Sequence, residues 1–335
     1  MEKKGALGRI KSTFIGDRAF YQSVVKLLIP IVIQQGITSF VNLLDNVMVG
    51  ALSTAAIVNQ LIFVFNLSIF GSLSGPSIYS AQYAGVGDDE GVKHCFRFKM
   101  IIGTLISVAA VLVFALFGEN LIWLYLNEEV NTAETLAATL EQAKDYMYVM
   151  LWGLPPFMLS QAYGTTLRET GETVVPMQAS IISIVTNCVL NYALIYGKFG
   201  APAMGVKGAA IATVIARYLE IAYILIHTYR RLDKYHYFRG ALRNLKIPKE
   251  LVKKIAVTGA PLLANEFLWS TAMAVKNQCF SYRGLAVVAA TNITSTVWQV
   301  FAIIMFAMGS AIAIMVGQQL GTGDIEEARR TDARL

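Results

Sequence analysis

The sequence predicts an all-α integral membrane protein. Of its 335 residues, 55% are hydrophobic and only 15% are charged, against about 25% charged residues in a typical soluble domain. No charged residue occurs between Asp45 and Asp88 or between Arg283 and Asp324, and each stretch can cross a hydrocarbon core of about 30 Å more than once. The composition therefore excludes an ordinary soluble globular protein.

Eight apolar segments are long enough to span a bilayer, which takes about 20 helical residues. Backbone N–H and C=O groups in lipid must find their hydrogen-bond partners within the protein. No segment alternates between polar and apolar residues as a barrel strand does, so we expect helices throughout. The expected helices cover residues 27–50, 53–80, 99–118, 142–163, 174–196, 207–229, 255–282 and 285–318. Pro76, Pro155 and Pro156 lie inside these segments and remove backbone donors, so we expect kinks there.

The distribution of Lys and Arg orients the chain. With the N-terminus in the cytoplasm, 22 of the 28 basic residues lie on the cytoplasmic side, including three in the loop 85–99 and nine in 230–254, whereas the outer loop 119–141 is acidic. A basic segment directly after a membrane helix is expected to stay inside and to contact anionic lipid headgroups. We therefore expect a multi-pass protein of the plasma (inner) membrane that binds no nucleic acid.

Two segments of the chain repeat each other. Residues 81–90 read AQYAGVGDDE and residues 317–326 read GQQLGTGDIE, so that Gln, both Gly, Asp and Glu match in register. Six crossings separate the two copies, so both enter the membrane from the same side and the repeat is parallel. The second bundle has only two helices before the chain stops, and we expect it to be incomplete.

The repeat divides the chain into four expected parts. They are a cytoplasmic tail over 1–26, a six-helix bundle over 27–229, a basic linker over 230–254, and the first two helices of a second bundle with the following loop over 255–335.

A series of motifs, taken in order, resembles the multidrug and toxic compound extrusion transporters. The motifs are Pro30 with Asn42–Gly50, the turn of residues 81–88, Leu167–Thr173 with Pro176, Asn187 and Asn191 followed by Leu194–Gly197, and Gly205–Thr213. The resemblance covers residues 26–330 and implies an antiporter of two six-helix bundles around a V-shaped cavity. It would export organic, often cationic, compounds in exchange for H+ or Na+. We expect a small-molecule substrate and membrane lipid as partners, no cofactor besides the coupling ion, and a monomer.

Several polar residues lie where helices cross the membrane, and burying an ionisable group there costs at least about 2.5 kcal/mol. Asn187 and Asn191 are four apart and share one helix face, so they could also hydrogen-bond between helices. The resemblance places Asp45, Asn187, Asn191 and Thr213 together as the cation or proton site, with no metal other than a possible Na+. Asn191 stands where some relatives have a second Asp, so the choice of ion remains open.

Four further charged residues lie in the expected membrane helices and are weaker candidates for a coupling site. Glu266 is a candidate second coupling or substrate group, with pairing to Asn265 or a neighbouring helix as the alternative. Lys276 is expected to extend toward the outer surface. Arg217 and Glu220, three apart on one helix, are expected to neutralise each other.

The sequence also bears on three other functions. A membrane-embedded enzyme would need a convergent catalytic set, but His94, His227 and His236 lie at or beyond helix ends, so we expect no enzyme. A lipid-linked oligosaccharide flippase of related architecture would need a strongly cationic cavity, whereas the intramembrane charges here are mixed and few. A channel stays an alternative because its pore residues resemble those of a transporter, and saturable, gradient-dependent flux would distinguish the two.

Overall fold

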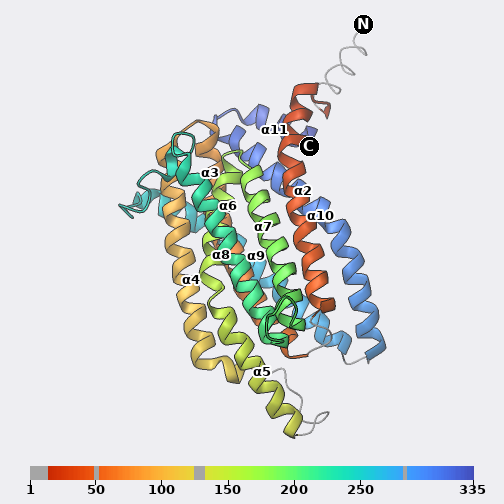
Figure 1. The fold of residues 1–335 in the computed structure, drawn as a ribbon. Helices are drawn as coiled ribbons and strands as arrows, with labels where there is room; N and C mark the ends of the chain where they lie inside the picture. Colours follow the sequence, from red (N-terminus) through yellow and green to blue (C-terminus); the bar gives the residue numbers. More distant parts are fainter. Residues whose placement is uncertain (1–13, 49–52, 124–132, 282–284) are drawn as a thin grey trace.

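The computed structural model describes residues 14–48, 53–123, 133–281 and 285–335, and all regular elements in these ranges are helices (Figure 1). Their bounds are α2 Arg18–Met48, α3 Ser53–Gly85, α4 Asp89–Trp123, α5 Ala133–Leu151, α6 Leu154–Glu169, α7 Val174–Tyr196, α8 Gly205–Arg230, the 3₁₀ turn η1 His236–Phe238, α9 Lys249–Ser281, α10 Leu285–Gly321 and α11 Ile325–Arg334. The predicted all-α fold is confirmed.

Six of these helices are long and apolar enough to cross a membrane. The corresponding stretches are Arg18–Ile37, Leu61–Gly85, Asp89–Trp123, Val174–Tyr196, Gly205–Arg230 and Phe301–Gly321. Of the other described helices, α5 and α6 are shorter than these six and α9 is more polar, so the expected eight crossings stay a prediction. Figure 1 shows the long helices side by side, with the start of α2 and α11 at the same end. We call this the basic end, because it also carries the basic linker between α8 and α9.

Four helices, α2, α4, α5 and α9, begin six to ten residues before their apolar segments. α4 begins at Asp89 rather than near residue 99, because the carboxylate of Asp88 accepts a hydrogen bond of 3.0 Å from the backbone N–H of Gly91 and caps the helix. α9 likewise begins at Lys249 rather than near 255. Lys99, which we had placed in a cytoplasmic loop, therefore lies well inside α4.

The fourth expected helix is broken into α5 and α6. Pro155 and Pro156 have no backbone N–H, so they cannot continue the hydrogen bonding of the preceding turn. The chain instead tightens, and the N–H groups of Trp152 and Gly153 donate to carbonyls three residues back. The expected interruption is confirmed here, whereas Pro76 lies inside the continuous helix α3.

The two copies of the repeat contact each other at the basic end. A Cβ atom added to Gly85 of α3 would lie 2.0 Å from the backbone oxygen of Gln318 on α10. A Cβ atom on Gly321 would lie 1.9 Å from the backbone oxygen of Gln82. The contact is reciprocal, because Gly85 corresponds to Gly321 and Gln82 to Gln318. It agrees with the predicted parallel repeat and explains why both copies carry glycine.

The Gly-Asp pair of the repeat forms the same turn twice. Gly87 and Gly323 have φ angles of 71° and 82°, a left-handed conformation that glycine adopts without a steric penalty. Asp324 then caps α11 by accepting a hydrogen bond of 2.9 Å from the N–H of Glu327, as Asp88 caps α4. Each copy thus ends one long helix and begins the next in the same way.

The basic linker packs against the bundle through its aromatic residues. Tyr235, Tyr237 and Phe238 are at most 5% exposed, and the Phe238 ring lies 4.9 Å from those of Phe96 on α4 and Tyr163 on α6. Its aromatic residues bury apolar area against the bundle, while its charged residues remain largely at the surface. Contact of these charged residues with lipid headgroups stays a prediction.

Polar contacts fix the linker in place. The guanidinium of Arg97 donates to the backbone oxygens of Ala241 at 2.7 Å and Lys246 at 3.3 Å. Lys234 forms a hydrogen-bonded ion pair with Glu172, and the hydrogen bond to this carboxylate raises the pKa of Lys234. Burial raises the pKa of Tyr237, whose hydroxyl lies 2.8 Å from that of Thr170.

Candidate functional site

Three of the four predicted cation-site residues lie together between α7 and α8. The side-chain amide of Asn191 donates to the Oδ1 of Asn187 at 3.0 Å, and the amide of Asn187 donates to the Oγ1 of Thr213 at 3.1 Å. Asn187 and Asn191 are only 5% and 1% exposed. The spacing of four residues on α7 aligns the two amides on one face, and α8 supplies the hydroxyl. The result is a short, largely buried row of amide and hydroxyl oxygens, which we call the Asn187 row.

Asp45 lies near the end of α2, a helix that packs beside α7. Its side chain lies outside the described residues. The role of Asp45 beside Asn187 therefore stays a prediction.

Glu266 and Lys276 lie elsewhere, on α9. A Cβ atom on Gly71 of α3 would be 3.7 Å from the Cβ of Glu266, so this side chain packs where α9 crosses α3. Lys276 is exposed. Among the described residues, no hydrogen bond connects either side chain with the Asn187 row. The structure does not bring Glu266 and that row into one site.

Arg217 and Glu220 make no direct contact with each other, although they still interact electrostatically, as expected from their spacing. The guanidinium of Arg217 donates to the backbone oxygen of Gly153 at 3.3 Å and stacks 4.6 Å above the ring of Phe157. Glu220 instead accepts a hydrogen bond of 3.2 Å from the hydroxyl of Ser180 on α7. The spacing of three residues permitted a pair within α8, but better partners on neighbouring helices take both side chains.

The contact of Glu220 belongs to a chain that crosses four helices. Arg168 at the end of α6 donates to the Oε1 of Gln34 on α2 at 3.1 Å, and the Nε2 of Gln34 donates to the Oγ of Ser180 at 2.9 Å. The hydroxyl of Ser180 then reaches Glu220 on α8. Sequence reasoning missed this chain, because its members are far apart in sequence.

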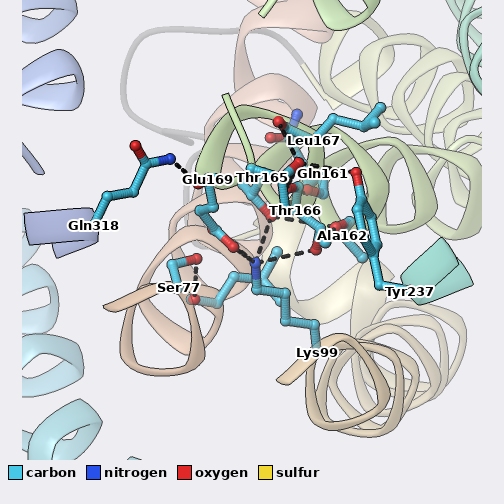
Figure 2. A network of polar contacts seen from close by, with 12 residues as sticks. Ser77, Lys99, Gln161, Ala162, Thr165, Thr166, Leu167, Glu169, Tyr237 and Gln318 are labelled. Carbon is cyan, nitrogen blue, oxygen red and sulfur yellow. Dashed lines mark hydrogen bonds and ion pairs between the residues drawn. The ribbon is translucent and has the colours of Figure 1, made fainter. Parts of the chain in front are cut away.

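A buried ion pair lies near the basic end of the bundle (Figure 2). The Nζ of Lys99 lies 2.7 and 2.6 Å from the carboxylate oxygens of Glu169, and 3.2 Å from the hydroxyls of Thr165 and Thr166. Lys99 is completely buried and Glu169 is 5% exposed. The three N–H groups of the ammonium are therefore all satisfied. Counting the helix from the Asp88 cap would have placed Lys99 inside α4.

The same turn of α6 contacts the second repeat. The backbone oxygen of Glu169 accepts a hydrogen bond of 2.7 Å from the Nε2 of Gln318 on α10, visible at the left of Figure 2. Lys99 thus holds a residue whose backbone contacts α10. Among the described residues, no group of three or more His, Cys, Asp or Glu is placed to bind a metal ion.

Comparison with known proteins matches this chain to one family and to several relatives. Residues 30–193 and 261–333 match the MatE family. The chain is 26% identical over 318 residues to the probable multidrug resistance protein YoeA of Bacillus subtilis, covering 92% of this chain and 66% of that protein. It is 25% identical over 311 residues to the probable multidrug resistance protein NorM of Thermotoga maritima, covering 91% and 64%.

Solved structures share the fold. One is described as the outward-facing conformation of a multidrug resistance MATE family transporter, with a TM-score of 0.77 and 22% identity over 94% of this chain and 68% of that one. Another, from Pyrococcus furiosus, is described as having a binding pocket of reverse polarity that suggests a different function, with a TM-score of 0.74 and 21% identity over 96% and 69%. The chain thus spans about two thirds of the length of the proteins that it matches.

Proposed function

The chain belongs to the MatE family, a family of transporters rather than enzymes, and on this premise we propose that it acts in cation-coupled export. The proposed cargo is an organic, often cationic, compound, exchanged for H+ or Na+ by alternating access. Relatives described as multidrug resistance proteins support this class of cargo.

The largely buried Asn187 row is the observation that carries the proposal. Amide and hydroxyl oxygens can replace the hydration shell of a small hard cation, and oxygen ligands are those that such ions prefer. A carboxylate from Asp45 would add the negative charge, and the same group can take up a proton. Binding of the ion would favour one arrangement of the surrounding helices over another. Coupled exchange requires that the ion bind these two arrangements with different affinities.

We further propose that the basic end faces the cytoplasm, in the plasma (inner) membrane. The start of α2, the linker and α11 all lie at this end (Figure 1), and these segments are rich in Lys and Arg. Cytoplasmic segments carry such an excess of basic residues.

The test measures uphill transport in vesicles that contain the purified chain. A fluorescent organic cation should accumulate against its own gradient when an H+ or Na+ gradient is imposed. Asp45→Asn should abolish this accumulation and leave the unfolding temperature unchanged, because the two side chains have nearly the same shape. Asp145→Asn is the matched control, since Asp145 forms an exposed ion pair with Lys207.

Two outcomes would contradict the proposal. Accumulation by Asp45→Asn at the unmutated rate would show that Asp45 is structural, and Glu266 would be the next group to test. Non-saturable flux that needs no ion gradient would indicate a channel.

A further inference from the structure

The hydrogen-bond chain that ends at Glu220 has a fixed direction. A guanidinium can only donate, so Arg168 requires the carbonyl oxygen of Gln34 as its acceptor. The amide nitrogen of Gln34 must then donate to the Oγ of Ser180, which leaves the hydroxyl proton of Ser180 to point at Glu220. All donors therefore point the same way, and the chain ends on an acceptor. This polarity follows from the chemistry of the groups and matches an ionised carboxylate.

The bond between Ser180 and Glu220 lies on the same two helix faces as the Asn187 row. Ser180 precedes Asn187 by seven residues on α7, and Glu220 follows Thr213 by seven residues on α8. Seven residues make two helical turns, about 10 Å along the axis. The chain thus forms a second polar level between α7 and α8, nearer to the basic end.

Glu220 is unusual among the acids of the described spans. Within the six candidate membrane spans, it is the only acidic residue more than five residues from a span end. Two cations face it, Arg168 from α6 and Arg217 from its own helix. Arg168 interacts with both Glu220 and the neighbouring acid Glu169, but Glu169 is shared with Lys99. Loss of the charge of Glu220 would therefore remove part of the compensation of the half-buried Arg168.

We propose that Glu220 is a second proton-binding group of the bundle, whose charge state is transmitted through Ser180 and Gln34 to α2. Protonation changes the Ser180 bond from a charge-assisted to a neutral one, which is about half as strong. Gln34 is then held less firmly, and it belongs to the helix that carries Asp45 about three turns further along. The inference rests on the proposed function, because it links a second proton site to the proposed coupling helix.

Infrared difference spectroscopy of the full chain in lipid vesicles tests the inference without requiring transport. A pH titration should show the C=O stretching band of a protonated carboxylic acid, and Glu220→Gln should remove one such band. Ser180→Ala removes a donor to the anion, so the midpoint of that band should move to higher pH by about one unit, a tenfold change in proton affinity. Glu119→Gln is the control, because Glu119 is half-exposed in an ion pair with Lys144.

The outcomes separate this inference from the proposed function. Titration spectra of Glu220→Gln identical to those of the unmutated chain would overturn it, as would an unmoved midpoint in Ser180→Ala. If Asp45→Asn abolishes uphill transport while the Glu220 band is absent in all variants, the proposed function stands and this inference fails. If the Glu220 band titrates as expected while Asp45→Asn transports normally, Glu220 is a proton-binding group and the proposed coupling role of Asp45 fails.

Discussion

Substituting Lys99 by Met should strongly destabilise the bundle. Lys99 is completely buried, and its ammonium donates to both carboxylate oxygens of Glu169. Methionine fills a similar volume but leaves the carboxylate of Glu169 buried without this cation. Removal of one partner of a buried ion pair costs about 3–5 kcal/mol, most of it from the uncompensated charge.

The double variant Lys99→Met with Glu169→Met separates the pair from its surroundings. Thr165 and Thr166 keep acceptors for their hydroxyls in the backbone oxygens of α6, so the double variant should lose far less than the single one. Replacing both partners by apolar groups is often neutral. The double-mutant cycle should then give a coupling free energy of about 3 kcal/mol or more between the two residues.

The assay is the free energy of unfolding in detergent micelles, measured by titration with a denaturing detergent. Lys207→Met is the control, because its exposed ion pair with Asp145 should contribute little. A loss below about 1 kcal/mol for Lys99→Met, the range of exposed pairs, would refute the reasoning, as would a double variant no more stable than the single one.

Three further predictions follow from packing and burial. Gly321→Ala should separate α3 from α10 at the basic end, because its methyl group would lie 1.9 Å from a backbone oxygen. Cysteine cross-linking between the two helices should therefore fall, whereas Gly309→Ala, whose methyl group would meet nothing within 4 Å, should leave the cross-linking unchanged. Phe238→Ala should reduce the free energy of linker docking by about 3–5 kcal/mol and speed proteolysis of the linker. Unaltered cleavage, or equal acceleration by Phe199→Ala at an exposed site, would contradict this. Burial raises the pKa of Tyr237, so docking should be fully stable below the ordinary tyrosine pKa of about 10 and weaken as the pH rises above it. Tyr237→Phe should reduce this alkaline loss in the same proteolysis assay, and Tyr235, whose pKa is also raised by burial, accounts for a further part.

Apolar length and helical spacing predicted most of the helices. The all-α fold, the parallel repeat and the break at Pro155 and Pro156 could be predicted because each depends on local chemistry. The early start of α4 could not be seen from hydropathy, since its first turns are polar and depend on the cap of Asp88. Buried Lys99 was misplaced as a consequence.

Residue spacing predicted the candidate site only where its residues are neighbours on one helix, and the family resemblance added Thr213 from another helix. Asn187 and Asn191 could be assigned to one face from their spacing, and the structure places Thr213 beside them. Glu220 could not be assigned a partner in this way, because the choice between Arg217 on α8 and Ser180 on α7 depends on how the two helices pack. The packing of the linker could not be predicted for the same reason, because the contacts of its aromatic residues depend on how α4 and α6 pack.

The reciprocal contact of the two repeats has the geometry of an isologous interface, in which the same patch appears on both partners. Two halves of one chain meet here as the subunits of a symmetric dimer would, with Gly85 against Gln318 and Gly321 against Gln82. A side chain larger than hydrogen is excluded at both glycine positions by the main chain of the opposite half. Substitution of either glycine is therefore restricted, and this restriction accounts for glycine at both matching positions of the repeat.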